Sequence, residues 1–481
     1  MKESKIKFGT DGWRAVIAED FTFANLGLVT EAIAKYLKNG KLSDRGVFIG
    51  YDNRFLSEDF AKHCADCFAI SGIKPYLSTI SVPTPLTAFM AVELKLNGSV
   101  MITASHNPSK YNGIKFIPDY GGPAEDKVTG QIESALKEII NSRNTGFIRE
   151  TDATGIEYIT DYSSYKKKLL NSVDRAIIKE KKPSLAVDTM HGSSGILMPE
   201  ILNGALNLDA VLLNNFRDTL FGGRLPDPSE KNLSGLKRLI QSENLDLGVA
   251  LDGDADRFGA IDRKGYFISP NNAIALILYY FLETGRFEKS DIAVRTVATT
   301  HLIDEICENN KIDFKETPVG FKYIGKEMLG GNVLIGGEES GGLSIKGHIP
   351  EKDGLLAVLI LIEIQSYLKK YKNSIFLSEY LEKIYERYGH YYNIRLDIEI
   401  KPEKKNKIIE HFLNLEGKSI ENIKVDKINN IDGAKVLLTN KSWILIRASG
   451  TEPLIRCYIE SKDKDYFVKL QEYARSVILA I

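Results

Sequence analysis

The chain has 481 residues, with 63 Lys and Arg against 64 Asp and Glu and a net charge of -1 at pH 7. This balance argues against a protein built around wholesale contact with nucleic-acid phosphates. Hydrophobic residues make up 43% of the chain, which excludes disorder as a global description. At roughly 150 residues per domain the length corresponds to about three domains, with two or four equally compatible.

No segment reaches the roughly 18 uninterrupted apolar residues that a membrane helix requires. The longest apolar runs, Ala273–Leu282 and Leu355–Ile362, are predicted to be buried helices. The first eight residues are polar and basic, which gives no sign of secretion, and four scattered cysteines fit a reducing compartment. We therefore expect a cytoplasmic protein that binds neither membranes nor nucleic acids.

Short runs rich in Val and Ile alternate with amphipathic stretches, a pattern that favours α/β units with parallel sheets. In chain order we predict a strand at Val47–Tyr51, a helix at Ser57–Ile70 capped by Ser57, and a strand at Val100–Thr103. Further strands are predicted at Leu185–Asp188, Leu247–Leu251, Ile292–Val297 and Val333–Ile335. Polar or Gly-rich residues follow these strands at their carboxyl ends, where open α/β sheets bind ligands.

The pattern changes near residue 370. Alternating segments at Tyr392–Ile400 and Trp443–Arg447 predict a smaller α+β module. The predicted domains are α/β domains at 1–155, 156–265 and 266–375, followed by an α+β domain at 376–481.

Three carboxylates, Asp252, Asp254 and Asp256, follow the predicted strand at Leu247–Leu251. Such a loop can converge on one hard cation, and Mg²⁺ bound by few carboxylates favours a phosphate oxygen as a further ligand. An EF-hand is disfavoured because its essential Gly and Glu positions hold Arg257 and Arg263. The alternative is a solvated acidic turn.

A serine is presented after another strand, in the segment from Thr103 to Pro108. The Asn-Pro step forces a turn that would expose Ser105 beside His106 and Lys115. No Gly-x-Ser-x-Gly elbow surrounds it, which disfavours an acyl-transfer nucleophile. A phosphoryl carrier would instead have its charge neutralised by the metal and nearby cations. A plain surface turn is the alternative.

Two further loops have the composition of ligand-binding segments. Residues 336–342 place Glu338, Glu339 and Ser340 between glycines, which suits acceptors for sugar hydroxyls. Nearby, His348 and residues 351–354 could add cations, although they also form a good helix start. Each loop has a structural alternative, a Gly-rich turn or a cap.

The last cluster is rich in arginine and hydroxyl groups, from Arg447 to Pro453 with Arg456 beyond it. These groups form a phosphate-binding nest without any metal, and also fit a tight turn between strands at Ile444–Ile446 and Ile455–Ile459. By contrast, Gly417-Lys418-Ser419 lacks the upstream Gly of a P-loop, and no Gly-x-Gly-x-x-Gly follows a strand, so ATP and NAD have no support.

Taken in order, these motifs resemble those of the α-D-phosphohexomutase superfamily, the phosphoglucomutase and phosphomannomutase group. The resemblance extends from residues 8–14, Phe-Gly-Thr-Asp-Gly-Trp-Arg, to Arg456. It implies three related α/β domains and a mobile C-terminal domain around a central cleft.

The resemblance also implies roles for individual residues. Ser105 is similar to the family's phosphoserine and, with Asp252, Asp254 and Asp256, to its Mg²⁺ ligands. Arg14, His106, Lys115 and Arg257 match positions that line the transferring phosphate, with Lys115 a candidate for acid/base work. The expected substrate-binding residues are Gly320, Lys322, Glu338, Ser340, His348, Lys352, Arg447, Ser449, Gly450, Thr451 and Arg456.

The implied reaction interconverts hexose 1-phosphate and hexose 6-phosphate through phosphorylated Ser105 and a bisphosphorylated sugar. Glucose phosphates are the first expectation, with glucose 1,6-bisphosphate as activator, and mannose or glucosamine phosphates are the alternatives. The expected protein is a monomer or homodimer. A phosphatase and a phosphosugar-binding protein without catalysis remain the rival classes.

Overall fold

The computed structural model describes residues 6–9, 12–142, 154–449 and 453–481. They form two compact units. Unit 1 contains the chain up to Pro270 together with residues 328–331 and 340–378. Unit 2 contains residues 271–327, 332–339 and 379–481. No helix in the described part of the chain is long and apolar enough to cross a membrane.

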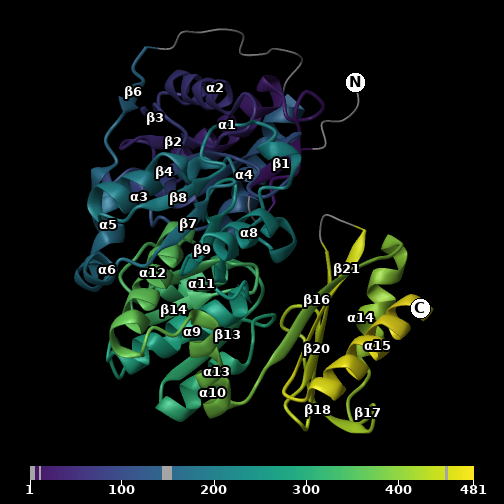
Figure 1. The fold of residues 1–481 in the computed structure, drawn as a ribbon. Helices are drawn as coiled ribbons and strands as arrows, with labels where there is room; N and C mark the ends of the chain where they lie inside the picture. The colour runs from purple at the N-terminus through teal and green to yellow at the C-terminus, as the bar shows by residue number, and fades with distance from the viewer. Residues whose placement is uncertain (1–5, 10–11, 143–153, 450–452) are drawn as a thin grey trace. The chain divides into compact units, whose positions relative to one another are not determined.

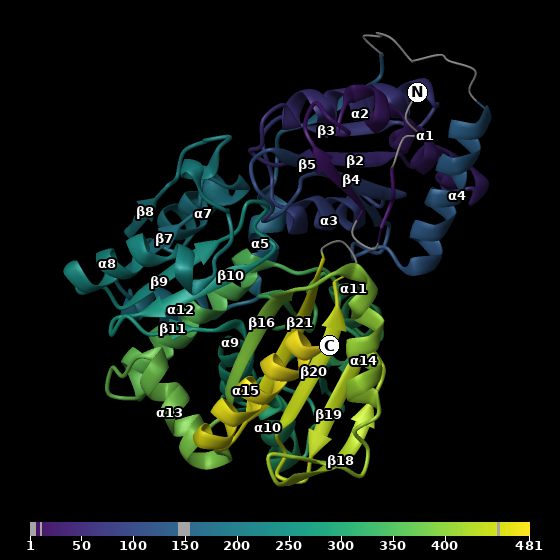
Figure 2. The same cartoon turned by 90° about the vertical axis from the view of Figure 1, so that its right-hand side faces the viewer.

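The first sheet of unit 1 has the order β1-β5-β4-β2-β3-β6. Strands β2, β3, β4 and β6 run parallel, whereas β5 is antiparallel to both β1 and β4. Helices α1, α2 and α4 cover one face and α3 covers the other (Figure 2). The bounds are β1 Trp13–Val16, α1 Phe23–Asn39, β2 Val47–Tyr51, α2 Ser57–Ile70, β3 Pro75–Ser78, α3 Thr84–Glu93, β4 Gly98–Ile102, β5 Tyr111–Pro118, α4 Asp126–Ser142 and β6 Glu157–Ile159.

The second sheet of unit 1 has the order β11-β10-β9-β7-β8, with β7 parallel to β8 and β9. Helix α8 packs on one face, and α12 packs on β9 and β10. The bounds are α5 Ser163–Asn171, α6 Arg175–Lys181, β7 Leu185–Asp188, α7 Leu197–Pro199, β8 Ala210–Leu213, α8 Ser234–Ser242, β9 Leu247–Leu251, β10 Phe258–Asp262, β11 Phe267–Ile268, β15 Leu343–Ile345 and α12 Gly354–Tyr371.

Unit 2 contains three parallel strands in the order β13-β12-β14 and an antiparallel sheet in the order β16-β21-β20-β19-β18-β17. Helices α14 and α15 pack on one face of the antiparallel sheet (Figure 1). The bounds are α9 Pro270–Glu283, β12 Ile292–Thr296, α10 Leu302–Asn310, β13 Asp313–Thr317, α11 Phe321–Met328, β14 Val333–Gly337, α13 Leu377–Tyr388, β16 Tyr392–Glu399, α14 Lys405–Leu413, β17 Ser419–Ile420, β18 Ile423–Asn429, β19 Ala434–Leu438, β20 Trp443–Ala448, β21 Leu454–Ser461 and α15 Lys464–Ala480.

The predicted fold class is confirmed, because mixed sheets flanked by helices precede a C-terminal antiparallel sheet. One local prediction was wrong. Ser57 is not the cap of α2, since the helix already begins at this residue and the capping position is Leu56. The Ser57 hydroxyl instead donates to Asp52 Oδ1 at 2.9 Å. The three predicted boundaries between the four domains stay a prediction.

Candidate active site

The acidic loop is the turn of the hairpin formed by β9 and β10 in unit 1. The turn is closed by the Arg257 N–H, which donates to Asp252 Oδ1 at 3.0 Å, and by the Ala255 N–H, which donates to the Asp252 carbonyl at 3.0 Å. Asp252, Asp254 and Asp256 are buried, and each offers an oxygen within 4.8 Å of the others. The hairpin therefore places three carboxylates at one point, as the sequence predicted.

Gly253 is required here by a close approach. A Cβ at this position would lie 2.9 Å from the Ser105 carbonyl oxygen and 3.2 Å from Pro226 Cγ. Such contacts are too short for any other residue without a shift of the backbone. The small residue thus lets the serine segment approach the carboxylates, a reason that the spacing of the aspartates alone does not reveal.

Ser105 lies just beyond β4 with its backbone in the left-handed region, at φ 50°. Its hydroxyl donates to Asp252 Oδ2 at 3.1 Å and lies 3.3 Å from His106 Nδ1. A non-glycine residue held in this region is strained, and such strain is concentrated at functional sites. The serine and the acidic loop, 147 residues apart in the chain, meet in one place.

Arg54, which the sequence analysis missed, holds the serine segment through hydrogen bonds to its backbone. It is fully buried, pairs with Asp52 at 3.1 Å, and donates to the carbonyl groups of Asn107, Pro108 and Tyr111 at 2.7 to 2.9 Å. The Thr103 hydroxyl donates to Asp52 Oδ2 at 2.6 Å and accepts from the Ser105 N–H at 2.8 Å. The only signal in the sequence is a charged pair directly after the strand that ends at Tyr51.

Two lysines neutralise the acidic loop. Lys115 Nζ, on β5, lies 3.0 Å from Asp254 Oδ2 and 3.3 Å from Asp256 Oδ2. Lys352 Nζ lies 3.3 Å from Asp256 Oδ2. The Thr84 hydroxyl, another group that the sequence analysis missed, donates to Asp254 Oδ2 at 2.6 Å from the start of α3.

The pKa values of Asp252 and Asp256 are shifted in opposite directions. Burial raises the pKa of Asp252 well above its usual range, and the neighbouring charges of Asp256 and Asp254 raise it further. Burial would raise the pKa of Asp256 too, but Lys352, Lys115 and Arg257 hold it below the usual value. The three buried carboxylates therefore repel one another. Lys115 and Lys352 offset this repulsion at Asp256 but not at Asp252.

The remaining predicted cations lie around the same serine. Arg14, on β1, donates to Asn107 Oδ1 at 2.9 Å. The charge of Arg257, then burial, then the charge of Arg14 lower the pKa of His106 well below its usual value. A neutral imidazole can donate a hydrogen bond from one ring nitrogen and accept one at the other. Unit 1 thus brings together Arg14, Ser105, His106, Lys115, Asp252, Asp254, Asp256, Arg257 and Lys352.

His348 is placed away from this cluster. Its side chain is fully buried, and Nε2 lies 2.8 Å from Asp353 Oδ2. The role of His348 in substrate binding stays a prediction.

The sugar-loop residues lie where the chain passes from unit 2 to unit 1. Glu338 directly follows β14 in unit 2, whereas Ser340 belongs to unit 1. Gly320, at φ 128°, precedes α11, and Lys322 lies in its first turn with Nζ 4.8 Å from the centre of the Tyr323 ring. Glu338, Gly320 and Lys322 thus follow β14 and β13, two of the parallel strands of unit 2.

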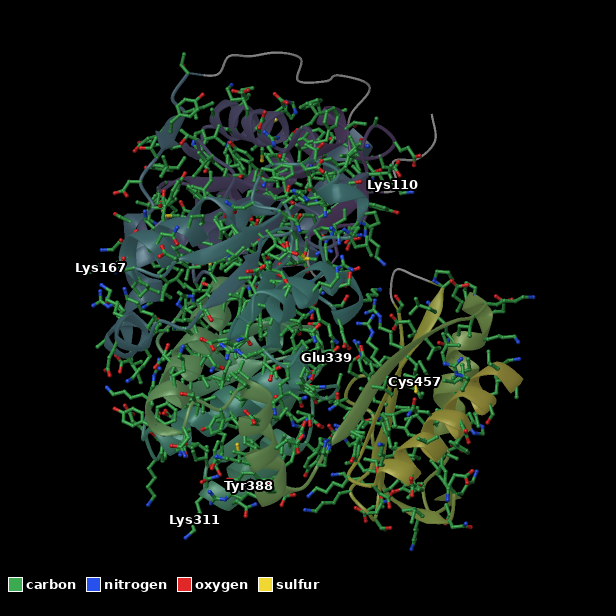
Figure 3. The ribbon with its side chains drawn as sticks, in the orientation of Figure 1. Lys110, Lys167, Lys311, Glu339, Tyr388 and Cys457 are labelled. Atoms are coloured by element: carbon green, nitrogen blue, oxygen red, sulfur yellow. The ribbon has the colours of Figure 1, made fainter. Side chains whose placement is uncertain are left out.

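The predicted phosphate loop connects β20 and β21 in unit 2. Arg447 and Arg456 stand opposite each other in the ladder, and Arg447 lies 2.8 Å from Asp432 Oδ2. Burial would lower the pKa of Arg447, but the charge of Asp432 raises it. Tyr458 and Glu339 add smaller contributions in the same direction. Figure 3 labels Glu339. Ser449 N–H donates to the Leu454 carbonyl at 3.1 Å. Gly450 and Thr451 lie outside the described residues.

Buried carboxylates beside a strained serine, on a fold of α/β sheets with an antiparallel fourth sheet, define the class of enzymes that move phosphoryl groups on sugars. Comparison with known proteins is more specific. Four models of phosphoglucomutase/phosphomannomutase match the chain: α/β/α domain I at residues 5–143, domain II at 163–265, domain III at 269–388, and the C-terminal domain at 398–476.

Individual relatives match over nearly the full chain. A Thermococcus kodakarensis phosphoglucomutase/phosphomannomutase is 30% identical, over 97% of this chain and 96% of its own. A Sulfurisphaera tokodaii phosphoglucosamine/phosphogalactosamine mutase is 27% identical, over 98% of each. The crystal structure of a Thermus thermophilus protein described as a phosphomannomutase has a TM-score of 0.83 and 31% identity, over 98% of this chain and 99% of its own.

The chain belongs to the phosphoglucomutase/phosphomannomutase family of the α-D-phosphohexomutase superfamily, and it is a phosphohexomutase, an isomerase.

Proposed function

We propose that the protein interconverts hexose 1-phosphate and hexose 6-phosphate through a phosphoryl group carried by Ser105, with glucose phosphates as the preferred pair. The observation that carries this proposal is the 3.1 Å contact between the Ser105 hydroxyl and Asp252, inside a buried cluster of three carboxylates and several cations. A serine in this setting is suited to hold a phosphoryl group whose charge is neutralised on all sides.

The three aspartates fit a divalent cation. Asp254 Oδ1 and Asp256 Oδ1 are buried without a hydrogen-bond partner among the described residues, and buried polar atoms are seldom left in this state. Asp252, Asp254 and Asp256, with an oxygen on Ser105, would hold Mg²⁺. When bound, the ion would supply positive charge beside the transferring phosphoryl group.

The residues of the chain account for the rest of the reaction. Arg14, Lys115 and Arg257 would bind and orient the phosphoryl group as it passes from Ser105 to a sugar hydroxyl. The Ser105 oxygen–phosphorus bond breaks and a bond from phosphorus to the sugar oxygen forms. Lys115 is the candidate acid/base group: its ammonium gives a proton to the departing Ser105 oxygen and takes the proton of the sugar hydroxyl. The bisphosphorylated sugar then reorients and returns its other phosphoryl group to Ser105.

The anchoring of the substrate is proposed for unit 2. Arg447 and Arg456, with Ser449 and the loop that follows it, would hold the phosphate that does not react. Glu338, with Ser340 at the start of the next segment, would accept hydrogen bonds from sugar hydroxyls. Gly320 and Lys322 at the start of α11 are the other proposed substrate-binding groups of unit 2. Lys352, which belongs to unit 1 and reaches Asp256 at 3.3 Å, would contact the phosphoryl group in transit, so that its effect falls on kcat.

Glucose is the proposed sugar because the loop of residues 336–342 and residues 351–354 resemble those of phosphoglucomutases. The Thermococcus relative is named phosphoglucomutase/phosphomannomutase. Mannose and glucosamine phosphates are the alternatives, the latter named for the Sulfurisphaera relative. Glucose 1,6-bisphosphate is the proposed activator.

The test compares turnover of glucose, mannose and glucosamine 1-phosphates by the wild-type protein and by Ser105→Ala, with Mg²⁺ and a trace of the matching bisphosphate. We expect the fastest turnover with glucose 1-phosphate and none with Ser105→Ala. Faster turnover of another sugar would revise the substrate. Release of inorganic phosphate would indicate a phosphatase, and binding without turnover would indicate a sensor.

A further inference from the structure

Asp353 is a fully buried carboxylate at the start of α12 in unit 1. Its Oδ1 accepts from the Leu356 N–H at 3.1 Å, which caps the helix. Its Oδ2 accepts from the Tyr165 hydroxyl at 2.7 Å and lies 2.8 Å from His348 Nε2. One oxygen therefore caps the helix, while the other is held by two side chains, one five residues away and one 188 residues away.

The start of α12 in turn holds the acidic loop. The Gly354 N–H donates to the Ala255 carbonyl at 3.1 Å. A Cβ on Gly354 would lie 2.6 Å from the Arg257 carbonyl oxygen, so the two segments are in direct contact. Lys352, one residue before Asp353, reaches Asp256 Oδ2 at 3.3 Å. The position of Asp353 consequently determines where the Lys352 ammonium group meets the carboxylates.

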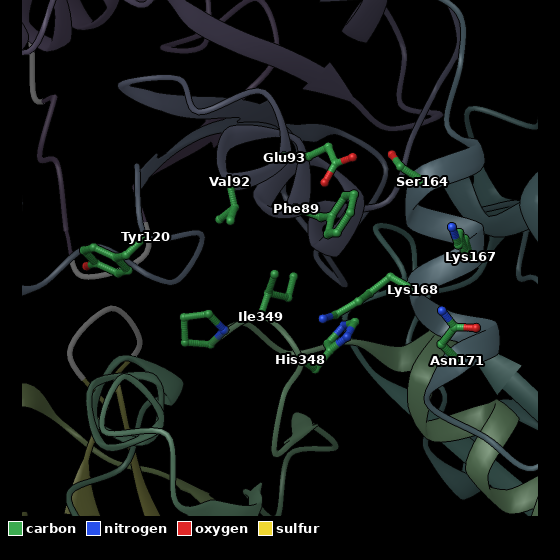
Figure 4. A pocket seen from close by; sticks show the side chains of 11 residues that line it. Phe89, Val92, Glu93, Tyr120, Ser164, Lys167, Lys168, Asn171, His348 and Ile349 are labelled. Carbon is green, nitrogen blue, oxygen red and sulfur yellow. The ribbon is translucent and has the colours of Figure 1, made fainter.

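Packing alone does not fix residues 348–350, the segment before α12. His348, Ile349 and Pro350 line a cavity of about 480 Å³, together with Phe89 and Lys168 (Figure 4). Because one side of the segment faces this space, hydrogen bonds must set its position. The Ser344 hydroxyl donates to the Ile349 carbonyl at 2.8 Å, and the His348 and Asp353 N–H groups donate to the Ile345 and Leu343 carbonyls at 3.1 and 2.9 Å. The contact of His348 Nε2 with Asp353 Oδ2 is a further link between side chains.

Tyr165 approaches Asp353 from α5, a helix that precedes the second sheet. Its side chain is fully buried, and its ring centre lies 5.5 Å from that of Phe89. Burial, followed by the charge of Asp353, raises the pKa of Tyr165 well above its usual value. The hydroxyl therefore remains a hydrogen-bond donor at any working pH.

We propose that Tyr165 and His348 are positioning residues that act through Asp353 to hold Lys352 against the acidic loop. This inference rests on the proposed function, because it assigns them an effect on phosphoryl transfer. Neither residue touches the substrate. Their removal should displace the Lys352 ammonium group from Asp256, which lowers kcat and leaves the binding of the sugar phosphate almost unchanged.

The first test is Tyr165→Phe, which deletes one hydroxyl and keeps the buried ring. Tyr162→Phe is the matched control, since Tyr162 adjoins the same helix, is buried, and has a hydroxyl 2.7 Å from both Ser78 Oγ and the Ile159 carbonyl oxygen. We expect Tyr165→Phe to lower kcat by about tenfold, with KM for glucose 1-phosphate within about twofold of wild type. Tyr162→Phe should match the wild-type kcat and have the same unfolding temperature as Tyr165→Phe.

His348 is tested by rescue. His348→Ala removes the donor to Asp353, and we expect a loss of kcat of about tenfold. His348→Gln retains an N–H group that can reach the same oxygen, so it should recover most of that loss at equal thermal stability. Equal activity of the two variants would contradict a role through Asp353.

The route through Lys352 is tested by adding Tyr165→Phe to Lys352→Ala. If Tyr165 acts through Lys352, the second change should cost almost nothing on this background. A tenfold loss that persists there, or a Tyr165→Phe protein as active as Tyr162→Phe, would overturn the inference while leaving the proposed function intact. A wild-type protein without turnover of hexose phosphates would overturn both.

Discussion

Each of the two clusters of charged residues contains buried polar atoms without a hydrogen-bond partner among the described residues. In unit 1, Asp254 Oδ1 and Asp256 Oδ1 are buried acceptors without a hydrogen-bond partner among the described residues. In unit 2, Arg447 Nε is a buried donor in the same state. Unmet groups of this kind destabilise a fold, so the first cluster suits a cation and the second suits an anion. The contrast supports the proposed division into phosphoryl transfer in unit 1 and phosphate anchoring in unit 2.

The clusters also differ in how deeply their ion pairs are buried. Lys115 is 6% exposed, and its carboxylate partner Asp254 is fully buried. Arg447 and Asp432 are 15% and 26% exposed. Lys115 is therefore held in place by a buried pair before a substrate arrives, whereas the ion pair of Arg447 keeps part of its surface open. Changes in unit 1 should affect kcat, and changes in unit 2 should affect KM.

The largest effect is expected from removal of the divalent cation. Treatment with EDTA should lower turnover by more than about 100-fold, because the crowded carboxylates of Asp252, Asp254 and Asp256 would then repel the phosphoryl group. Added Mg²⁺ should restore the rate. Full turnover in EDTA, with metal content verified by elemental analysis, would contradict the assignment of unit 1 as a cation site.

The next effect concerns the support of the serine segment. Arg54→Ala leaves Asp52 as a buried, unpaired carboxylate, and we expect the free energy of unfolding to fall by about 3 to 5 kcal/mol. Arg217→Ala is the control, since its pair with Glu58 is 43% and 49% exposed, and it should cost less than about 1 kcal/mol. Urea unfolding measures both. Equal losses would show that burial of the Asp52–Arg54 pair is not what matters.

Arg447→Ala tests the anchoring role of unit 2. We expect KM for glucose 1-phosphate to rise about tenfold while kcat falls far less, because the residue binds ground state and transition state alike. Arg475→Ala, an exposed arginine on α15, should leave both constants unchanged. A fall in kcat with constant KM would place Arg447 with the transfer chemistry and break the comparison.

The smallest effect is a pH dependence in unit 2. Burial would raise the pKa of Glu316, but Arg295 and Lys435, both within 2.7 Å, hold it at about 2. Its folded pKa is below the unfolded value of 4.5, so its stabilisation is complete above pH 4.5 and disappears as the pH falls toward 2. Glu316→Gln should flatten the stability curve in this window by up to about 1.4 kcal/mol per pH unit, whereas the exposed Glu138→Gln should not.

The sequence was informative where the signal is local. The strand at Val47–Tyr51, the helix at Ser57–Ile70 and the strand at Leu247–Leu251 have the predicted bounds, because apolar periodicity determines which faces are buried. The acidic loop and Ser105 could be predicted as well, since each motif lies at the end of a buried strand.

Contacts between distant segments could not be predicted. Arg54 lies about 50 residues from the carbonyl groups it binds, and no motif marks it. Ser57 has the composition of a cap, but Asp52 takes its hydroxyl. The contact of His348 with Asp353, and that of Asp353 with Tyr165, 188 residues away, were not predicted either. In each case a tertiary partner decides the role.

The central claim is that Ser105 carries the phosphoryl group in transit. The direct measurement is peptide mass spectrometry of the wild-type protein before and after incubation with glucose 1,6-bisphosphate, followed by a chase with excess glucose 1-phosphate. We predict that phosphate accumulates on the peptide containing Ser105 and leaves during the chase at a rate that matches turnover. The control variant Ser99→Ala, changed on β4, the strand before Ser105, should behave like wild type. Full mutase turnover with no phosphate on Ser105 would contradict the account.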